Sequence, residues 1–417
     1  MKKIEEKVYI NFEDVLIKPC VSSINSRKNV DLKLDVYNFS KKDYFKNWKP
    51  IPIMSANMDT ITDVVSAFEL LKKNWIAVLH KYVSLNDIQK IFDKIDYYNS
   101  KILSLNEENI TNSDLLFLEE NGMIEKLDLS EFYHLTQEEK DSKIEEYNRY
   151  VKTIVGKLSE KKYLIDYRNL FISRGTSEED KKKLEIRLFK EKRIQSVCID
   201  VANGYRTEVF EYIKELKNGI CKNKILMVGN VATYDAVKIY STLEVDIVKC
   251  GIGPGSACTT RIQTGVGVPQ IGMILEIKEN IEKDNISNIL ICSDGGCKEI
   301  GDISKAFVAG AEFVMLGGML AGHKENPGTI EEVNGKKVKR FSGMAAKESQ
   351  WNGVPTHGVH EGKTVMIPYK GKIKNTIFNI EGGIRSTCTY TNSKNIEELI
   401  LNANLIKVTV QENKKFS

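Results

Sequence analysis

Short apolar runs rich in β-branched residues recur along the chain, and each ends in small or polar residues. Uninterrupted runs of this length are typical of parallel strands that are buried on both faces. The eight runs span residues 51–57, 75–81, 170–177, 197–204, 225–231, 245–253, 289–296 and 312–318. Helix-like segments lie between most of them, among them residues 207–218, 233–243 and 302–311. The pattern predicts alternating strands and helices around a parallel sheet.

Two architectures fit this alternation, a (β/α)8 TIM barrel and a doubly wound open sheet. The count of eight strands and the polar residues at their carboxyl ends favour the TIM barrel. In such a barrel the functional site is built from the loops that follow the strands. Residues at the ends of the apolar runs are therefore the first candidates for function.

The connection between the second and third predicted strands is anomalous, because about 90 residues replace the usual loop and single helix. Residues 101–168 within it are rich in Lys, Glu, Asn, Asp and Tyr and predict one or two charged amphipathic helices. We therefore expect residues 1–100 to begin the barrel, 101–168 to form an inserted helical subdomain, and 169–417 to complete the barrel. This last part would carry the catalytic loop, a flap and a C-terminal cofactor segment. The insertion is either a solvated surface feature or a regulatory or interface subdomain.

The tail from Thr391 onward predicts one more helix and a short strand. They cover "NSKNIEELILNANL" (392–405) and "IKVTV" (406–410).

Composition narrows the class of protein only slightly. The chain has 417 residues, of which 41% are hydrophobic and 28% charged, which is ordinary for a globular protein. The net charge of +4 comes from scattered basic residues, and no nucleic-acid partner is expected. The basic start is not followed by an apolar signal-peptide core, and no run of about 18 apolar residues occurs. We expect a cytoplasmic protein without a membrane partner.

One of the eight cysteines stands in unusual surroundings. With no CxxC pair and no secretion signal, the cysteines are expected to be reduced, and the paired spacing of a zinc site is missing. Cys258, however, lies in "GIGPGSACTTRIQTGVG" (251–267), beside the hydroxyls of Thr259 and Thr260 and the cation of Arg261. Glycines cost folding entropy, so such a loop suggests close approach to a ligand. Most isolated cysteines are small buried hydrophobes, but this setting favours a nucleophile.

Two glycine pairs follow the seventh and eighth predicted strands. They are "SDGG" (293–296) and "LGG" (316–318), at the two loops where TIM barrels often hold a phosphate. Backbone N–H groups can converge on an anion at such places. Asp294 precedes the first pair, and it is either a ligand of a ribose diol or the cap of a turn or helix.

The cysteine loop resembles the signature of the IMP dehydrogenase and GMP reductase family. Further similar stretches cover essentially the whole chain outside the insertion. They are "FEDVLIKP" (12–19), "PIMSANMDT" (52–60), "IDVANGY" (199–205), "SDGG", "EFVMLGGMLAG" (312–322) and "EGGIRSTCTY" (381–390). In this family a cysteine forms a thioimidate with purine C2. The dehydrogenase branch then uses a flap with an Arg-Tyr pair, whereas the segment between Gly343 and Glu361 is too short and lacks that pair. The reductase branch, which converts GMP to IMP with NADPH and releases ammonia, is therefore the better match.

The resemblance implies a role for each matching residue. Cys258 would attack the purine, and Thr260 and Glu361 would relay a proton to the departing amine. The implied substrate contacts are Ser256, Asp294, Gly295, Gly296, Gly317, Gly318, Gly343, Met344, Ala345, Glu361 and Gly362. The implied potassium site consists of carbonyl groups at Gly253, Gly255, Cys258 and Arg261.

The implied NADPH site has two parts. The nicotinamide side would be lined by Lys81, Thr176, Asp200, Val201, Ala202, Asn203, Gly251, Ile252 and Gly253. The rest of NADPH would be reached by Ser26, Arg27, Ser386, Thr387, Cys388, Thr389 and Tyr390, where an arginine suits a 2′-phosphate. The resemblance further implies a homotetramer or a higher assembly, with part of this cofactor site supplied by a neighbouring subunit.

Two departures from the family pattern leave questions. The chain has "GMAA" where relatives carry Gly-Met-Ser-Ser, so Ala345 and Ala346 lack the hydroxyls. The flap (346–360) also lacks a Tyr-Arg pair, for which His357, His360 or Trp351 would substitute. Two other functions stay open: an IMP dehydrogenase, and a non-catalytic purine nucleotide sensor that signals through the insertion.

Overall fold

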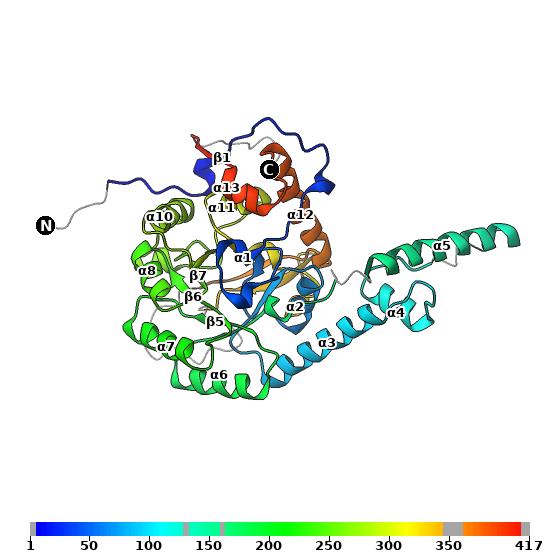
Figure 1. Ribbon diagram of the computed structural model, residues 1–417, viewed down its shortest axis with the longest axis horizontal. Coiled ribbons are helices and arrows are strands. Elements are labelled where there is room, and N and C mark those ends of the chain that lie inside the picture. Colours follow the sequence, from blue (N-terminus) through cyan, green and yellow to red (C-terminus); the bar gives the residue numbers. More distant parts are fainter. Residues whose placement is uncertain (1–5, 128–131, 133, 159–162, 345–361, 410–417) are drawn as a thin grey trace. The chain divides into compact units, whose positions relative to one another are not determined.

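The structure is a computed structural model of the 417-residue chain, and it describes residues 6–127, 132, 134–158, 163–344 and 362–409. Eight parallel strands close into a barrel in chain order (Figure 1), and the last strand pairs with the first. These strands are β2 (Ile53–Ser55), β3 (Ile76–Leu79), β4 (Leu170–Arg174), β5 (Ser196–Asp200), β6 (Ile225–Val231), β7 (Ile247–Cys250), β8 (Leu290–Asp294) and β9 (Phe313–Leu316). Each predicted run overlaps one of them, so the predicted TIM barrel is confirmed.

Helices follow the barrel strands as the alternating pattern predicts. They are α2 (Val64–Leu71), α3 (Leu85–Ser104), α6 (Glu178–Lys190), α7 (Thr207–Asn218), α8 (Tyr234–Thr242), α9 (Thr260–Thr264), α10 (Gln270–Lys283), α11 (Ile300–Val308) and α12 (Ile373–Tyr390). The predicted segment 207–218 coincides with α7. The other two predicted helices are shifted by one to three residues, because capping decides the ends: Glu299 and Asp302 form a capping box at the start of α11.

The interior of the barrel explains the uninterrupted apolar runs. Every residue of β2, β3, β4, β7 and β9 is buried. A strand in this position faces side chains of the barrel interior on one side and helices on the other, so neither face can be polar without a buried partner. The two charged residues in these strands, Arg174 and Lys249, therefore need an explanation.

Several smaller elements surround the barrel. An antiparallel pair joins β1 (Val15–Ile17) to β13 (Leu405–Lys407), and α13 (Ile396–Asn402) precedes the latter, so the tail has the predicted helix and strand. Short helical segments are η1 (Phe12–Asp14), η2 (Arg27–Asn29), α1 (Val36–Phe39), η3 (Asp43–Phe45), η5 (Tyr167–Asn169) and η6 (Gly318–Leu320).

A three-stranded antiparallel sheet, absent from the predicted elements, follows the last barrel strand. It contains β10 (Ile330–Val333), β11 (Lys336–Ser342) and β12 (Thr364–Pro368), in that order. Strands β11 and β12 pair with each other from either side of residues 345–361, so the two ends of that segment start from neighbouring positions.

The chain divides into two compact units, residues 1–88 with 166–417 and residues 89–165. The second unit contains most of α3 together with α4 (Asn112–Glu120) and α5 (Gln137–Leu158), so its expected helical character is present. Its small core includes Phe117, whose ring lies 5.7 Å from that of Tyr98, and the buried Val155. Among the described residues, no helix is both long enough and apolar enough to cross a membrane.

Candidate active site

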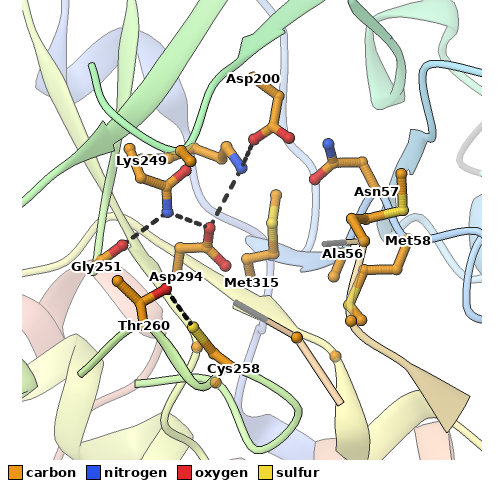
Figure 2. A pocket seen from close by; sticks show the side chains of 18 of the residues that line it. Ala56, Asn57, Met58, Asp200, Lys249, Gly251, Cys258, Thr260, Asp294 and Met315 are labelled. Carbon is orange, nitrogen blue, oxygen red and sulfur yellow. Dashed lines mark hydrogen bonds and ion pairs between the residues drawn. The ribbon is translucent and has the colours of Figure 1, made fainter. Parts of the chain in front are cut away.

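A cavity of about 910 Å³ lies at the carboxyl ends of the barrel strands. Every one of the eight strands contributes lining residues, either from its last two positions or from the loop that follows it. This is where TIM barrels carry their functional sites. Figure 2 shows the side chains that meet there, including Cys258, Asp200 and Asp294.

The half-buried Cys258 lies between β7 and α9, and its Sγ is 3.1 Å from Oγ1 of Thr260 (Figure 2). Arg261 holds this loop in shape, because its guanidinium donates to the carbonyls of Ile252 and Val268 at 3.1 and 2.5 Å. Burial lowers the pKa of Arg261. Gly253 has φ +80°, and a Cβ there would lie 2.4 Å from Cγ of Arg261. The glycine thus lets the loop fold tightly around the arginine stem.

The cysteine loop is tied to the end of the segment that carries the predicted flap. Cys258 and Gly362 form an isolated antiparallel bridge, and the Lys363 amide donates to the Ala257 carbonyl at 3.0 Å. The Gly343 amide in turn donates to the Lys363 carbonyl at 3.1 Å. Gly343, Met344 and Gly362 line the cavity.

Two predicted site residues, Ala345 and Glu361, lie outside the described residues, as does the predicted flap (346–360). Glu361 directly precedes Gly362 in the chain.

A buried lysine connects two sides of the cavity. Lys249, which is only 2% exposed on β7, forms ion pairs with Asp200 at the end of β5 and with Asp294 at the end of β8, at 2.5 and 3.3 Å. Asn230 donates to Oδ2 of Asp294 at 2.7 Å and to the Gly251 carbonyl at 2.9 Å. The dashed lines in Figure 2 trace this network across four adjacent strands.

The network keeps Lys249 and Asp200 ionised. Burial by itself would lower the pKa of Lys249, but the charges of Asp200 and Asp294 outweigh it and raise that pKa well above the ordinary value. Burial would raise the pKa of Asp200, yet the nearby Lys249 ammonium brings it below its ordinary value. The cavity therefore contains a fixed positive charge between two carboxylates at neutral pH.

Three of the four glycines in the two pairs occupy positions that disfavour a side chain. Gly295 and Gly296 have φ values of +85° and +89°, in the left-handed region that favours glycine. A Cβ on Gly318 would lie 2.8 Å from Oγ of Ser256. These close approaches bring the predicted phosphate loops and the cysteine loop to the same cavity.

The structure brings together most of the predicted site but not all of it. The predicted residues that line the cavity are Lys81, Thr176, Asp200, Val201, Ala202, Asn203, Gly251, Ile252, Gly253, Gly255, Ser256, Cys258, Thr260, Asp294, Gly295, Gly296, Gly317, Gly318, Gly343, Met344 and Gly362. The remaining predicted cofactor residues, Ser26, Arg27 and 386–390, do not line it. Ser26 and Arg27 lie at η2 and the others on α12, where Cys388 is buried. Thr387 and Tyr390 instead border a separate hollow of about 330 Å³.

The predicted potassium carbonyls differ in how they are used. The carbonyl of Gly255 accepts from the Cys258 amide, and that of Arg261 accepts from the Gly265 amide at the end of α9. Within the described part of the chain, no hydrogen bond is donated to the carbonyls of Gly253 and Cys258. Uncharged carbonyl oxygens suit a hard monovalent cation, so this loop fits such an ion at Gly253 and Cys258 better than at Gly255 and Arg261.

Sequence reasoning missed several lining residues, notably Lys249, Asn230 and Arg206. The signal for Lys249 was a lysine inside an otherwise apolar run, and Asn230 is the second-to-last residue of another run. Arg206 is exposed at the cavity and donates to Oγ1 of Thr176 at 3.1 Å.

An eight-stranded barrel with a cysteine loop and two glycine pairs at one cavity has the architecture of a TIM-barrel enzyme that binds a phosphorylated ligand. The IMP dehydrogenase / GMP reductase domain matches residues 9–415, and the chain belongs to this family. The resemblance in the sequence is thereby confirmed, and the family is one of oxidoreductases.

Similar proteins point to one branch of the family. The GMP reductase of Vibrio atlanticus is 33% identical to this chain, and the alignment covers 99% of each. The GMP reductases of Photobacterium profundum and Shewanella pealeana are 34% and 33% identical over 99% of this chain and 98% of their own length. A function of the GMP reductase type follows from this similarity.

Proposed function

We propose that this protein reduces GMP to IMP with NADPH and releases ammonia through a covalent intermediate on Cys258. The balanced reaction converts GMP, NADPH and two protons into IMP, NADP⁺ and ammonium. The Cys258 sulfur forms a bond to purine C2 as the C2 amine leaves. NADPH, when bound, supplies the hydride to C2. The carbon–sulfur bond then breaks, and its electron pair returns to the thiolate.

The observation that carries the proposal is the surroundings of the sulfur. Oγ1 of Thr260 lies 3.1 Å from Sγ of Cys258, and Gly362, the residue after Glu361, is bridged to Cys258. A hydroxyl beside the nucleophile and a carboxyl in the adjoining segment are the groups needed to protonate an amine. Because ammonia leaves far more readily than an amide anion, we assign this relay to Thr260 and Glu361.

The remaining cavity residues hold the reactants in place. Asp294 would accept from the ribose hydroxyls, and the amides near Gly295, Gly296, Gly317 and Gly318 would bind the phosphate. Lys249 and Asn230 position the Asp294 carboxylate. No proton has to enter or leave this network during the reaction.

The cavity also fits the nicotinamide half of the cofactor. Its volume exceeds the needs of one nucleotide, and Lys81, Thr176 and Asp200 form the wall on the side of β3–β5. Arg206 adds a cation there, which suits the pyrophosphate.

The other half of NADPH would be bound by Ser26, Arg27 and 386–390 of a neighbouring subunit, since these residues do not line the cavity of their own chain. A homotetramer or a higher assembly in the cytoplasm is part of this proposal, and sedimentation analysis tests the assembly. A potassium ion on the cysteine-loop carbonyls would hold that loop in shape. The division into residues 1–100, 101–168 and 169–417 stays a prediction.

The decisive experiment measures NADPH oxidation with GMP in the wild type, Cys258→Ala and Cys297→Ala. We expect turnover in the wild type and loss of at least about a thousandfold in Cys258→Ala, because the covalent route is removed. Cys297 is the matched control: it also lines the cavity, but burial raises its pKa, so it stays a thiol. Comparable rates of NADPH oxidation in the wild type and Cys258→Ala would rule out the covalent mechanism.

The same samples separate the alternatives. Sustained NADH formation from IMP and NAD⁺, with no reaction of GMP, would assign the protein to the dehydrogenase branch. Binding of GMP without NADPH oxidation would favour the nucleotide sensor.

A further inference from the structure

Two buried arginines outside the proposed active site lack the partners that buried cations need. Arg174 is the last residue of β4 and is 2% exposed, and Arg187 lies on α6 and is 7% exposed. Both guanidinium groups donate to one oxygen, the carbonyl of Val83, with Arg174 Nη2 at 3.4 Å. The two cations are therefore held side by side.

Neither arginine has a carboxylate partner among the described residues. The acceptor for both guanidinium groups is the Val83 carbonyl. Nε of Arg174 and Nη1 of Arg187 are buried and have no hydrogen-bond partner among the described residues. Burial lowers the pKa of Arg187 to about 10, so it remains charged at neutral pH. Two adjacent buried cations with unused N–H groups form an unfavourable arrangement unless an anion neutralises them.

We propose that Arg174 and Arg187 bind a small inorganic anion, either a halide or an oxyanion such as phosphate. Guanidinium groups present several N–H donors in a planar fork, which suits anions of both kinds. The unused donors, one on each residue, are the contacts that the ion would take up. This site is separate from the phosphate loops, which follow β8 and β9.

The position of the pair gives such an ion a structural effect. Val83 follows Lys81 by two residues and precedes α3, and Arg174 is followed directly by Gly175 and Thr176. Lys81, Gly175 and Thr176 line the cavity. An anion on the two arginines would therefore fix the bases of the loops after β3 and β4, which form the proposed cofactor wall.

Thermal unfolding of the wild type, Arg187→Met and Arg206→Met tests the proposal. Each protein is measured in sodium gluconate, a bulky anion, and then with sodium chloride or sodium phosphate added at constant ionic strength. We expect the melting temperature of the wild type to rise by about 1.5 °C in a saturable manner when the anion exceeds its Kd about tenfold, and that of Arg187→Met to rise less. Phosphate bound at the glycine loops contributes equally to the wild type and Arg187→Met and cancels when these two are compared.

Arg206→Met is the control for the chloride series, because it removes one arginine charge but leaves the pair intact, and its response to chloride should equal that of the wild type. A gain with chloride identifies a halide site, and a gain with phosphate alone identifies an oxyanion site. In gluconate, Arg187→Met should be at least as stable as the wild type, since one of two like charges is gone. Equal gains in the wild type and Arg187→Met would overturn the proposal.

Crystals of the wild-type protein soaked in sodium bromide or sodium phosphate provide a second measurement that needs no variant. Bromide anomalous density or phosphate density at Nε of Arg174 and Nη1 of Arg187 supports the site. Absence of both ions from this position overturns it. Neither measurement uses catalysis, so failure of this site is distinguishable from failure of the proposed function.

Discussion

Two clusters of buried cations lie in the same barrel and are neutralised in different ways. Lys249 on β7 is paired with two carboxylates, Asp200 and Asp294, that the chain itself provides. Arg174 and Arg187, on β4 and α6, share only the carbonyl of Val83. The first cluster is complete within one chain, whereas the second has donors left for an external anion.

The two clusters differ in how strongly they depend on the composition of the solution. A lysine bound by two carboxylates keeps its charge over a wide pH range, so it remains an ion-pair partner of Asp294 across that range. The arginine pair responds instead to the anions present. The β5–β8 side of the barrel should therefore be insensitive to dissolved anions, whereas the β3–β4 side should respond to them.

Removal of Lys249 should cause the largest loss of stability of all the substitutions considered for the two clusters. In Lys249→Met, Asp200 and Asp294 lose their shared cation, and we expect the free energy of unfolding to fall by about 4 kcal/mol. Urea denaturation measures this loss, and Lys249→Arg, which retains the charge, should recover part of it. A loss below about 1 kcal/mol would show that the carboxylates do not depend on the lysine.

The contribution of this cluster should not change between pH 5 and 9. The lowered pKa of Asp200 gives stability that is present above 3.8 and is lost only as pH falls through the folded value. The raised pKa of Lys249 gives stability that is present below 10.5 and is lost only as pH rises through its folded value. The difference between the wild type and Lys249→Met should therefore be flat across this window.

The β3–β4 side should show a pH dependence that the β5–β8 side lacks. His80 is buried at the end of β3, its carbonyl accepts from the Val83 amide, and burial lowers its pKa from 6.5 to about 4. The unfolded chain takes up this proton first, so stability is lost as pH falls from 6.5 to 4, by about 3 kcal/mol.

His80→Asn provides the comparison for that measurement, since its Oδ1 can replace Nδ1 as the acceptor for the Tyr82 amide. Denaturation of both proteins at pH 7 and pH 4 should show the extra loss only in the wild type. Parallel curves would place His80 in contact with solvent.

Asn230→Ala tests how much the uncharged Asn230 side chain contributes to the stability of the Lys249, Asp200 and Asp294 cluster. It removes hydrogen bonds to Asp294 and to the Gly251 carbonyl, and we expect a loss of about 1–2 kcal/mol in unfolding free energy. A double-mutant cycle with Lys249→Met should give a coupling energy of at least about 0.5 kcal/mol, because both side chains bind Asp294. Additive effects would contradict a single network.

The smallest effect on stability is expected at Arg206, an exposed cation that has only the Thr176 hydroxyl as partner among the described residues. Arg206→Gln should change the unfolding free energy by less than about 0.5 kcal/mol. If it contacts the cofactor as proposed, steady-state kinetics should show a KM for NADPH raised several-fold with kcat nearly unchanged. An unchanged KM would remove it from the cofactor wall.

The barrel and the cysteine loop could be predicted because their signals are local. An apolar run such as 225–231 identifies a buried strand, and the glycines around Cys258 identify a constrained loop. The three-stranded sheet has no such signal. Every residue of β10 is exposed, and β11 begins with "KKVKR", so only pairing with neighbouring strands makes these segments sheet.

By itself, the sequence determined which segments form the strands of the barrel, where helices lie between them, and which thiol lies among glycines. Only the tertiary structure decided which buried charges have partners. The carboxylates that pair with Lys249 are 49 and 45 residues away in the chain, and the carbonyl shared by Arg174 and Arg187 is 91 and 104 residues away. Hydrophobic periodicity is a property of neighbouring residues, whereas the neutralisation of a buried charge depends on groups that meet only when the barrel closes.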